Sequence, residues 1–232
     1  DWIGKLILKN YAPCNKSYGF HFERYDNNIF TPVIRTQIRN LDPTNDGHYT
    51  VYLPAYKDEL LVKALTKFPQ TTWQVFSKHN KRSIQVKNVS IRPIDNEAFI
   101  ESMAKSKGVL CGAGFETPAE ALFLKKKLLV IPMKNQYEQA CNAAALEAMG
   151  VPVIKNLKKK HHATIATWLE KGQVIDVYYP DITKNIIDLI IEEHLNKKKS
   201  KEVVHQFINT IDNIYGALKI KSTLALRYYH EF

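Results

Sequence analysis

Short apolar runs alternate with helical patterns through the middle of this chain, and this alternation restricts the fold more than any other feature. Several of the runs lack a period-two pattern, which is typical of strands that are buried on both faces of a sheet. Predicted helices over 57–68 and 95–106, and others that begin at Thr117 and Asn135, separate them. The pattern predicts an α/β domain with a parallel sheet and helices on both faces. The predicted strands are 48–54, 72–77, 87–92, 108–111, 128–132 and 153–154.

The chain of 232 residues divides by pattern into three parts, 1–47, 48–156 and 157–232. The first is aromatic and strand-like, and it ends in a turn-rich linker over 41–47. The second holds the alternating pattern. The third is predicted to be helical, with an apolar stripe over 203–218. The chain opens on Asp1 and its first methionine is Met103, so we expect that a segment precedes it.

Composition excludes several classes of protein. Hydrophobic residues make up 45% of the chain, which excludes a disordered protein. The longest apolar run, 128–133, is much shorter than the roughly 18–20 residues of a membrane span. Three scattered cysteines do not suit a disulfide framework or a zinc site, and they favour a reducing, cytoplasmic environment: Cys14, Cys111 and Cys141.

The charge balance is basic. Lys and Arg number 33 against 23 Asp and Glu, a formal net charge of +10, which indicates an anionic partner. The lysine runs at 158–160 and 197–199 lie apart and have no interleaved aromatic residues, so no nucleic acid is predicted. An anionic small molecule, a peripheral contact with an anionic membrane and a solvated lysine-rich surface remain open.

One loop combines glycines with a helix start. Residues 111–120 run from a predicted strand through Gly112 and Gly114 into a helix predicted to begin at Thr117. Glycine lets the backbone approach a ligand closely, and the unpaired N–H groups of a helix N-terminus attract a phosphate. A local alternative stays open, because Thr117 and Glu120 also form the pattern of a capping box, in which Glu120 binds only the backbone.

A second loop, 132–143, gathers side chains that hydrogen-bond to hydroxyl groups, which suits a sugar. They are Asn135, Gln136, Glu138, Gln139 and Asn142. Two local alternatives remain here as well. Asn135 and Glu138 fit a capping box, and Asn142 could bind only a neighbouring loop.

The third loop, 91–95, holds Arg92 and Ile94 after a predicted strand, where it could pass under a nucleobase. Read alone, it is a strand–turn–helix junction. In an open parallel sheet all three loops lie at the carboxyl ends of strands, where ligands bind. A dinucleotide-binding fingerprint is matched only weakly, because Thr117 stands at its third glycine and the next strand ends without an acidic residue.

Together the first two loops form the longer pattern GxGFETxxEALFxxKxLLVIPxxxQxEQxxNAxxLExxGV. This pattern resembles the donor-binding half of the GT-B nucleotide-sugar glycosyltransferases. It is similar to the families of the lipid II-forming N-acetylglucosaminyltransferase and the UDP-glucuronosyltransferases. The match is dense over 91–152. The chain departs from it at Lys126 and Lys127, where many relatives have glycine, and at Glu138, where Asp or Gln is more frequent.

The resemblance implies a role for each loop. The backbone of 112–115 and the helix start would hold the donor diphosphate, and Glu120 would bind the ribose hydroxyls. Glu138 and Gln139 would bind the sugar, and the loop 92–94 would face the base. UDP is the expected nucleotide. The donor-binding residues implied in this way are Arg92, Ile94, Gly112, Ala113, Gly114, Phe115, Thr117, Glu120, Glu138, Gln139 and Asn142.

The resemblance also implies an organisation. Residues 48–156 would form a Rossmann-like donor domain, the C-terminal half of a GT-B fold. Residues 1–47 would be the remnant of an acceptor domain that supplies the catalytic base. His21 and Asp26 are the candidates for that base within this chain. The family needs no metal or other cofactor, and His161 and His162 are predicted to be solvated rather than metal ligands.

The sequence therefore predicts a sugar transferase of cell-envelope or polysaccharide biosynthesis, with a nucleotide-sugar donor and an unidentified lipid-linked or carbohydrate acceptor. We expect it to be cytoplasmic, with a peripheral membrane contact, and this chain to be inactive alone. Two alternatives stay open. One is a non-catalytic nucleotide-sugar-binding subunit that needs a partner, and the other is a GT-B-like sugar epimerase, whose further acidic and arginine motifs we do not find.

Overall fold

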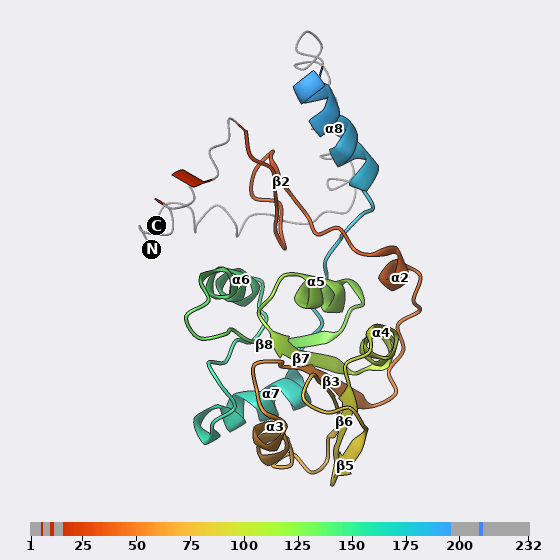
Figure 1. The fold of residues 1–232 in the computed structure, drawn as a ribbon, viewed down its shortest axis with the longest axis vertical. Helices are drawn as coiled ribbons and strands as arrows, with labels where there is room; N and C mark the ends of the chain where they lie inside the picture. The colour runs from red at the N-terminus through yellow and green to blue at the C-terminus, as the bar shows by residue number, and fades with distance from the viewer. Residues whose placement is uncertain (1–5, 7–9, 12–15, 196–208, 211–232) are drawn as a thin grey trace. The chain divides into compact units, whose positions relative to one another are not determined.

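The computed structural model describes residues 6, 10–11, 16–195 and 209–210 (Figure 1). These residues fall into two compact units that divide between Pro32 and Val33. The first unit contains β1 (Gly19–Phe20) and β2 (Ile29–Phe30), which pair in parallel. The residues of the apolar stripe predicted over 203–218 lie outside the described part of the chain.

The second unit is built on a six-stranded sheet. Its strands are β3 (His48–Tyr52), β4 (Thr72–Ser77), β5 (Ile84–Val86), β6 (Val89–Pro93), β7 (Gly108–Gly112) and β8 (Lys127–Ile131). Their order is β5-β6-β4-β3-β7-β8, and every neighbouring pair is parallel except β5 with β6. The predicted parallel sheet is therefore confirmed.

Three details of the predicted strands differ. The edge strand β5 was not predicted, and Lys87, placed in the next strand by the sequence, has a φ of +53° and forms the turn between β5 and β6. The strand predicted over 153–154 is wrong, because Val153 makes only an isolated bridge to Val130. The predicted bounds of β3, β4, β7 and β8 agree with the structure to within two residues.

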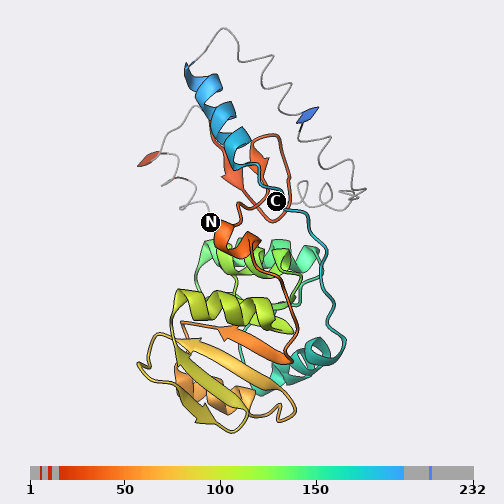
Figure 2. The same ribbon diagram turned by 90° about the vertical axis from the view of Figure 1, so that its right-hand side faces the viewer.

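Helices cover both faces of this sheet, which confirms the predicted α/β class (Figure 1). Figure 2 shows the same layers from the side, with α3 and α7 on one face of the sheet and α4 and α5 on the other. Leu60 of the helix predicted over 57–68 is 54% exposed. Among the described residues, no helix is both long enough and apolar enough to cross a membrane. The helices of this unit are α2 (Thr36–Arg39), α3 (Asp58–Leu65), α4 (Asn96–Lys105), α5 (Glu116–Phe123), α6 (Tyr137–Ala148), the 3-10 turn η1 (Lys159–His161), α7 (His162–Lys171) and α8 (Thr183–Leu195).

Aromatic rings fill the core on the face covered by α3 and α7. The ring centroids of Tyr49 and Trp73, on adjacent strands, lie 5.6 Å apart, and Trp168 of α7 packs edge-on against Tyr49 at 4.9 Å. Both tryptophans are almost fully buried. The Tyr49 hydroxyl donates a hydrogen bond to the carbonyl of Leu169 at 3.1 Å. The core therefore continues beyond the predicted donor domain, 48–156, into α7.

The segment 41–47, predicted as a linker between the first two parts, contains no helix or strand but lies within the second unit, because the two units divide between Pro32 and Val33. The buried Lys126 ties it to the sheet, because its Nζ donates hydrogen bonds to the carbonyls of Thr44 at 2.6 Å and Ser106 at 3.0 Å. Burial lowers the pKa of Lys126 below its usual value. The lysine at this position, where many relatives have glycine, thus serves as a structural donor.

Two helices end with the same hydrogen-bonded motif but with different residues in its left-handed position. After α6, Gly150 has a φ of +94°, and two successive N–H groups bond back to carbonyls of the last helical turn. After α5, Lys125 holds the same place with a φ of +55°. Glycine adopts this region without steric strain, whereas a residue with a Cβ does not.

Replacing Lys125 with glycine should raise the free energy of unfolding by about 0.5–1 kcal/mol, because relief of the strain exceeds the added entropy of the unfolded chain. Urea denaturation measures this change. The exposed Lys125–Asp176 pair, at 3.6 Å, contributes little. Lys125→Ala is the matched control, since it removes the charge and keeps the Cβ. An equal gain in both variants would contradict the explanation by backbone strain.

Candidate functional site

Two of the predicted loops meet at the carboxyl ends of β7 and β8. Gly112 closes β7, and a Cβ added to it would lie 3.7 Å from Oε1 of Gln139 in α6. The same oxygen accepts a hydrogen bond at 2.9 Å from the N–H of Met133, just after β8. The glycine loop and the start of α6 are therefore neighbours, as expected at the carboxyl edge of a parallel sheet.

The glycine loop is held on one side and open on the other. Ala113 is fully buried, and its carbonyl accepts a hydrogen bond at 3.2 Å from the side-chain amide of Asn142. Asn142 is buried too, so it does bind a neighbouring loop, the alternative that the sequence left open. A Cβ added to Gly114 would meet no atom within 4 Å. The backbone at Gly114 thus faces open space that a ligand can enter.

The helix that follows the loop begins without a side-chain cap. α5 starts at Glu116 with Phe115 as its N-cap, and the side chain of Phe115 makes no capping hydrogen bond. The alternative of a capping box between Thr117 and Glu120 is not formed, because Thr117 lies inside the helix and the Glu120 carboxylate has another partner. The uncapped N–H groups and the helix dipole create positive potential directly after Gly114.

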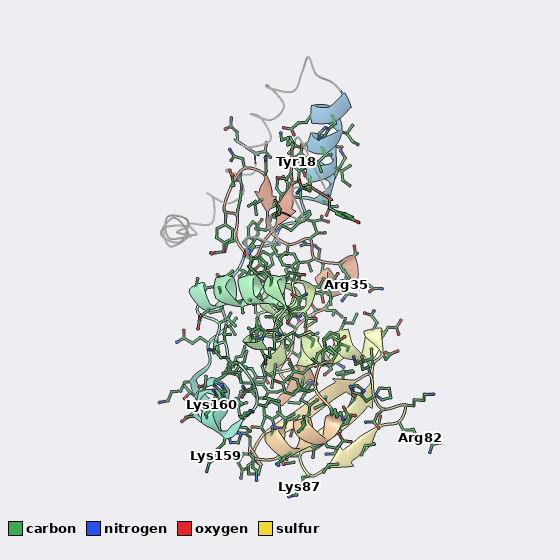
Figure 3. All side chains as sticks on the ribbon, turned by 60° about the vertical axis from the view of Figure 1, so that its left-hand side comes forward. Tyr18, Arg35, Arg82, Lys87, Lys159 and Lys160 are labelled. Carbon is green, nitrogen blue, oxygen red and sulfur yellow. The ribbon has the colours of Figure 1, made fainter. Side chains whose placement is uncertain are left out.

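The carboxylate of Glu120 binds Arg35, which lies 85 residues earlier in the chain. Nε and Nη2 of Arg35 donate to the two carboxylate oxygens, at 2.6 Å and 3.0 Å. Arg35 stands just before α2, and Figure 3 shows it near the surface. Its Nη1 donates to Oδ1 of Asn96, at the start of α4, at 3.1 Å. Sequence reasoning missed Arg35 and Asn96, because no local pattern marks a contact between segments so far apart.

The start of α6 is capped by Gln136, whose side chain accepts a hydrogen bond from the N–H of Gln139 at 3.1 Å. Asn135 has a φ of +61° and lies outside the helix, so the alternative of a capping box between Asn135 and Glu138 is not formed. The side chain of Glu138 is exposed, and no hydrogen bond to it is found within the described part of the chain. Oε1 of Gln139 already accepts a hydrogen bond from Met133, and the expected sugar contact of both residues stays a prediction.

Arg92 and Ile94, at the end of β6, differ in environment. The side chain of Arg92 lines a cavity between α4 and the face of the sheet. Ile94 is 46% exposed, and its N–H donates a hydrogen bond to the carbonyl of Ser77 at the end of β4. The expected role of these two residues beside a nucleobase stays a prediction.

The cavity beside Arg92 has a volume of about 370 Å³ and polar walls. Nε2 of the buried His48 lies 3.0 Å from the carbonyl oxygen of Ser102. The hydroxyl of Ser102 bonds in turn with Thr50 at 2.8 Å and Gln74 at 2.9 Å. Because these groups satisfy one another, we assign the cluster a structural role in joining α4 to the sheet.

His48 should make the stability of the protein depend on pH. Burial lowers the pKa of His48 below its usual value, so the unfolded chain, where this pKa is about 6.5, binds the proton more readily. The contribution of His48 to stability is complete above about pH 6.5 and is lost as the pH falls. We therefore expect His48→Asn to destabilise the protein more at pH 8 than at pH 5 in urea denaturation. An equal destabilisation at pH 8 and pH 5 would contradict this. The other histidines are present in both proteins, so their contributions to the pH dependence cancel in the comparison.

The two candidates for a catalytic base lie in the first unit. The ring of His21 packs against Phe22 and Tyr25, at centroid distances of 5.5 Å and 4.7 Å, and burial lowers its pKa. Asp26 accepts a hydrogen bond from the N–H of Asn27 at 2.6 Å. The roles of His21 and Asp26 as catalytic bases stay predictions.

His161 and His162, which follow the lysine run at 158–160, were predicted to be solvated. The structure shows that neither is fully exposed to solvent. The His162 ring packs edge-on against Phe68 at 5.6 Å, and the Nε2 atom of His161 is buried. Lys159 and Lys160 are exposed on η1 (Figure 3). Within the described residues, no group of three or more His, Cys, Asp or Glu is placed to hold a metal ion.

Comparison with known proteins gives the class. The family model described as Glycosyl transferase family 1 matches residues 9–171, more than half of the chain. This protein therefore belongs to glycosyl transferase family 1. The resemblance to GT-B nucleotide-sugar glycosyltransferases is thereby confirmed at the level of the family. A search of curated proteins finds no match.

Solved structures that resemble the chain are also glycosyltransferases. The glycotransferase of kitacinnamycin is 13% identical with a TM-score of 0.45, and the match covers 80% of this chain and 49% of that one. SnogD from Streptomyces nogalater is 11% identical with a TM-score of 0.43, covering 68% and 41%. The spinosyn forosaminyltransferase SpnP is 14% identical with a TM-score of 0.44, covering 81% and 50%. The chain thus spans about half the length of these proteins.

Proposed function

We propose that this protein is a glycosyltransferase that takes its sugar from a nucleotide-activated donor, and that the unit beginning at Val33 binds this donor. Membership of glycosyl transferase family 1 supports the reaction class. The observation that supports the site is an open glycine loop followed by an uncapped helix N-terminus at the end of β7. Backbone N–H donors and positive potential of this kind suit a diphosphate.

In this proposal each part of the donor has a complementary group. The diphosphate lies against residues 112–115 and the first turn of α5, whose N–H groups stabilise it as it leaves the sugar, without a metal. Glu120 accepts hydrogen bonds from ribose hydroxyls, and Glu138 and Gln139 bind sugar hydroxyls. The backbone at Ile94 faces the base. We propose uridine as the nucleoside.

The acceptor side of the reaction lies in a further domain that supplies the catalytic base and binds a lipid-linked or carbohydrate acceptor. A peripheral contact of the lysine-rich surface with an anionic membrane belongs to the same proposal. A second candidate function is a non-catalytic donor-binding chain that works with a separate partner. The two candidates differ in whether donor hydrolysis or transfer occurs without a second protein.

Calorimetric titration of the chain with UDP, dTDP, GDP and ADP, and with the matching monophosphates, tests the proposed site. We expect saturable binding of a diphosphate, tightest for UDP, and at least about tenfold weaker binding of its monophosphate, because charge-assisted hydrogen bonds are lost. A chain that is folded by circular dichroism but binds no diphosphate would refute the proposal. Equal affinities for the mono- and diphosphate would refute the site at α5.

A further inference from the structure

Glu120 is a carboxylate placed where it needs both a counter-charge and a fixed geometry. Its side chain is only 4% exposed, although it lies in the helix that opens with the proposed diphosphate site. A buried carboxylate is costly unless it is paired and hydrogen-bonded. Arg35 provides both through a two-pronged contact, in which Nε and Nη2 each donate to one carboxylate oxygen.

The contact with Arg35 uses only part of the hydrogen-bonding capacity of the Glu120 carboxylate. Two carboxylate oxygens offer about four lone-pair sites, and the guanidinium of Arg35 takes one on each oxygen. The remaining site on each oxygen is an acceptor only. Two neighbouring hydroxyl donors, such as those of a ribose, match this pair of acceptors.

Arg35 is itself held in place. The neighbouring Ile34 and Ile38 are buried, and the Arg39 guanidinium lies 5.1 Å from the ring centroid of Phe123 in α5. Asn96 binds the remaining prong of the Arg35 guanidinium at 3.1 Å. The arginine is thus fixed from its backbone side and from α4, so it can fix the orientation of Glu120 in turn.

We propose that Arg35 is a positioning residue of the donor site, which orients the Glu120 carboxylate to accept hydrogen bonds from the ribose hydroxyls of the nucleotide. This inference rests on the proposed donor-binding function. Arg35 itself does not touch the donor in this arrangement. Its effect is specific to the ribose, because it acts only through the carboxylate.

The test compares UDP with its 2′,3′-dideoxy analogue by calorimetric titration of the wild-type chain and of Arg35→Gln. We expect the wild type to bind UDP at least about tenfold more tightly than the dideoxy compound, since two hydrogen bonds to a charged acceptor are involved. In Arg35→Gln this preference should disappear through loss of UDP affinity alone. Arg35→Lys keeps the charge but not the fork, and should restore only part of the preference.

The outcomes separate this inference from the function on which it rests. A variant that is merely less well folded would lose affinity for both compounds together. An Arg35→Gln protein that keeps the full preference for UDP would overturn the positioning role, while the donor site would stand. A wild type that binds both compounds equally would overturn the ribose contact and with it the positioning role of Arg35, while the donor site would stand. A wild type that binds neither would refute the donor-binding function itself.

Discussion

Replacing Trp168 with alanine is expected to lower the free energy of unfolding by about 3–5 kcal/mol, the usual loss for a large buried aromatic side chain. Trp168 is 2% exposed, and its ring packs against Tyr49 in the middle of the sheet. The substitution would remove this contact and leave a cavity between α7 and β3. Urea denaturation of the whole chain, monitored by far-ultraviolet circular dichroism rather than tryptophan fluorescence, measures the change in the free energy of unfolding.

The matched control is Leu60→Ala in α3. Leu60 is 54% exposed, so its truncation should change the free energy of unfolding by no more than about 0.5 kcal/mol. This pair of variants tests whether the domain needs residues beyond 156. If Trp168→Ala lowers the free energy of unfolding by less than about 1 kcal/mol, then α7 is not part of the cooperative core.

Replacing Gly114 with leucine is expected to leave the fold intact and to weaken nucleotide diphosphate binding by about 100-fold or more. The fold tolerates the change because a Cβ at Gly114 meets no atom within 4 Å. The leucine side chain would instead fill the space beside the N-terminus of α5 that the proposed diphosphate needs. Loss of two charge-assisted hydrogen bonds, each worth roughly 1.5–3 kcal/mol, gives an effect of this size.

Calorimetric titration with UDP measures the affinity, and the thermal unfolding midpoint shows whether the fold is intact. Ala166→Leu is the control, because it adds the same bulk at an exposed position of α7, on the opposite face of the sheet. We expect that control to bind UDP as the wild type does. Undiminished binding by Gly114→Leu would show that the open face of the loop is not the diphosphate site.

Local patterns were sufficient wherever a single segment sets its own structure. The buried strands β3, β4, β7 and β8 follow from apolar runs, because only a strand covered on both faces is apolar without alternation. Asp95, the first residue of the helix predicted over 95–106, caps α4 by accepting a hydrogen bond from the N–H of Ala98 at 2.7 Å. Gly150 ends α6 in the left-handed region that glycine favours.

Local patterns failed where a distant partner competes for the same group. Thr117 and Glu120 have the spacing of a capping box, yet the guanidinium of Arg35 gives the carboxylate a charge-assisted contact that a backbone N–H cannot equal. The domain predicted to end at 156 leaves out α7, also because a distant contact is involved. Trp168 of α7 belongs to the core through its contact with Tyr49, and no local sequence pattern indicates a contact between residues so far apart.

The sequence by itself determined the parallel α/β sheet, the family and the three loops at its carboxyl edge, because periodicity and short motifs act over a few neighbouring residues. The tertiary structure alone decided which side chains and backbone groups of those loops are accessible and which partners they have. It opened the space at Gly114, left α5 uncapped, turned Arg92 toward α4 and joined Arg35 to Glu120. These features depend on burial and on charge pairing between segments up to 85 residues apart, and only the folded chain brings such segments together.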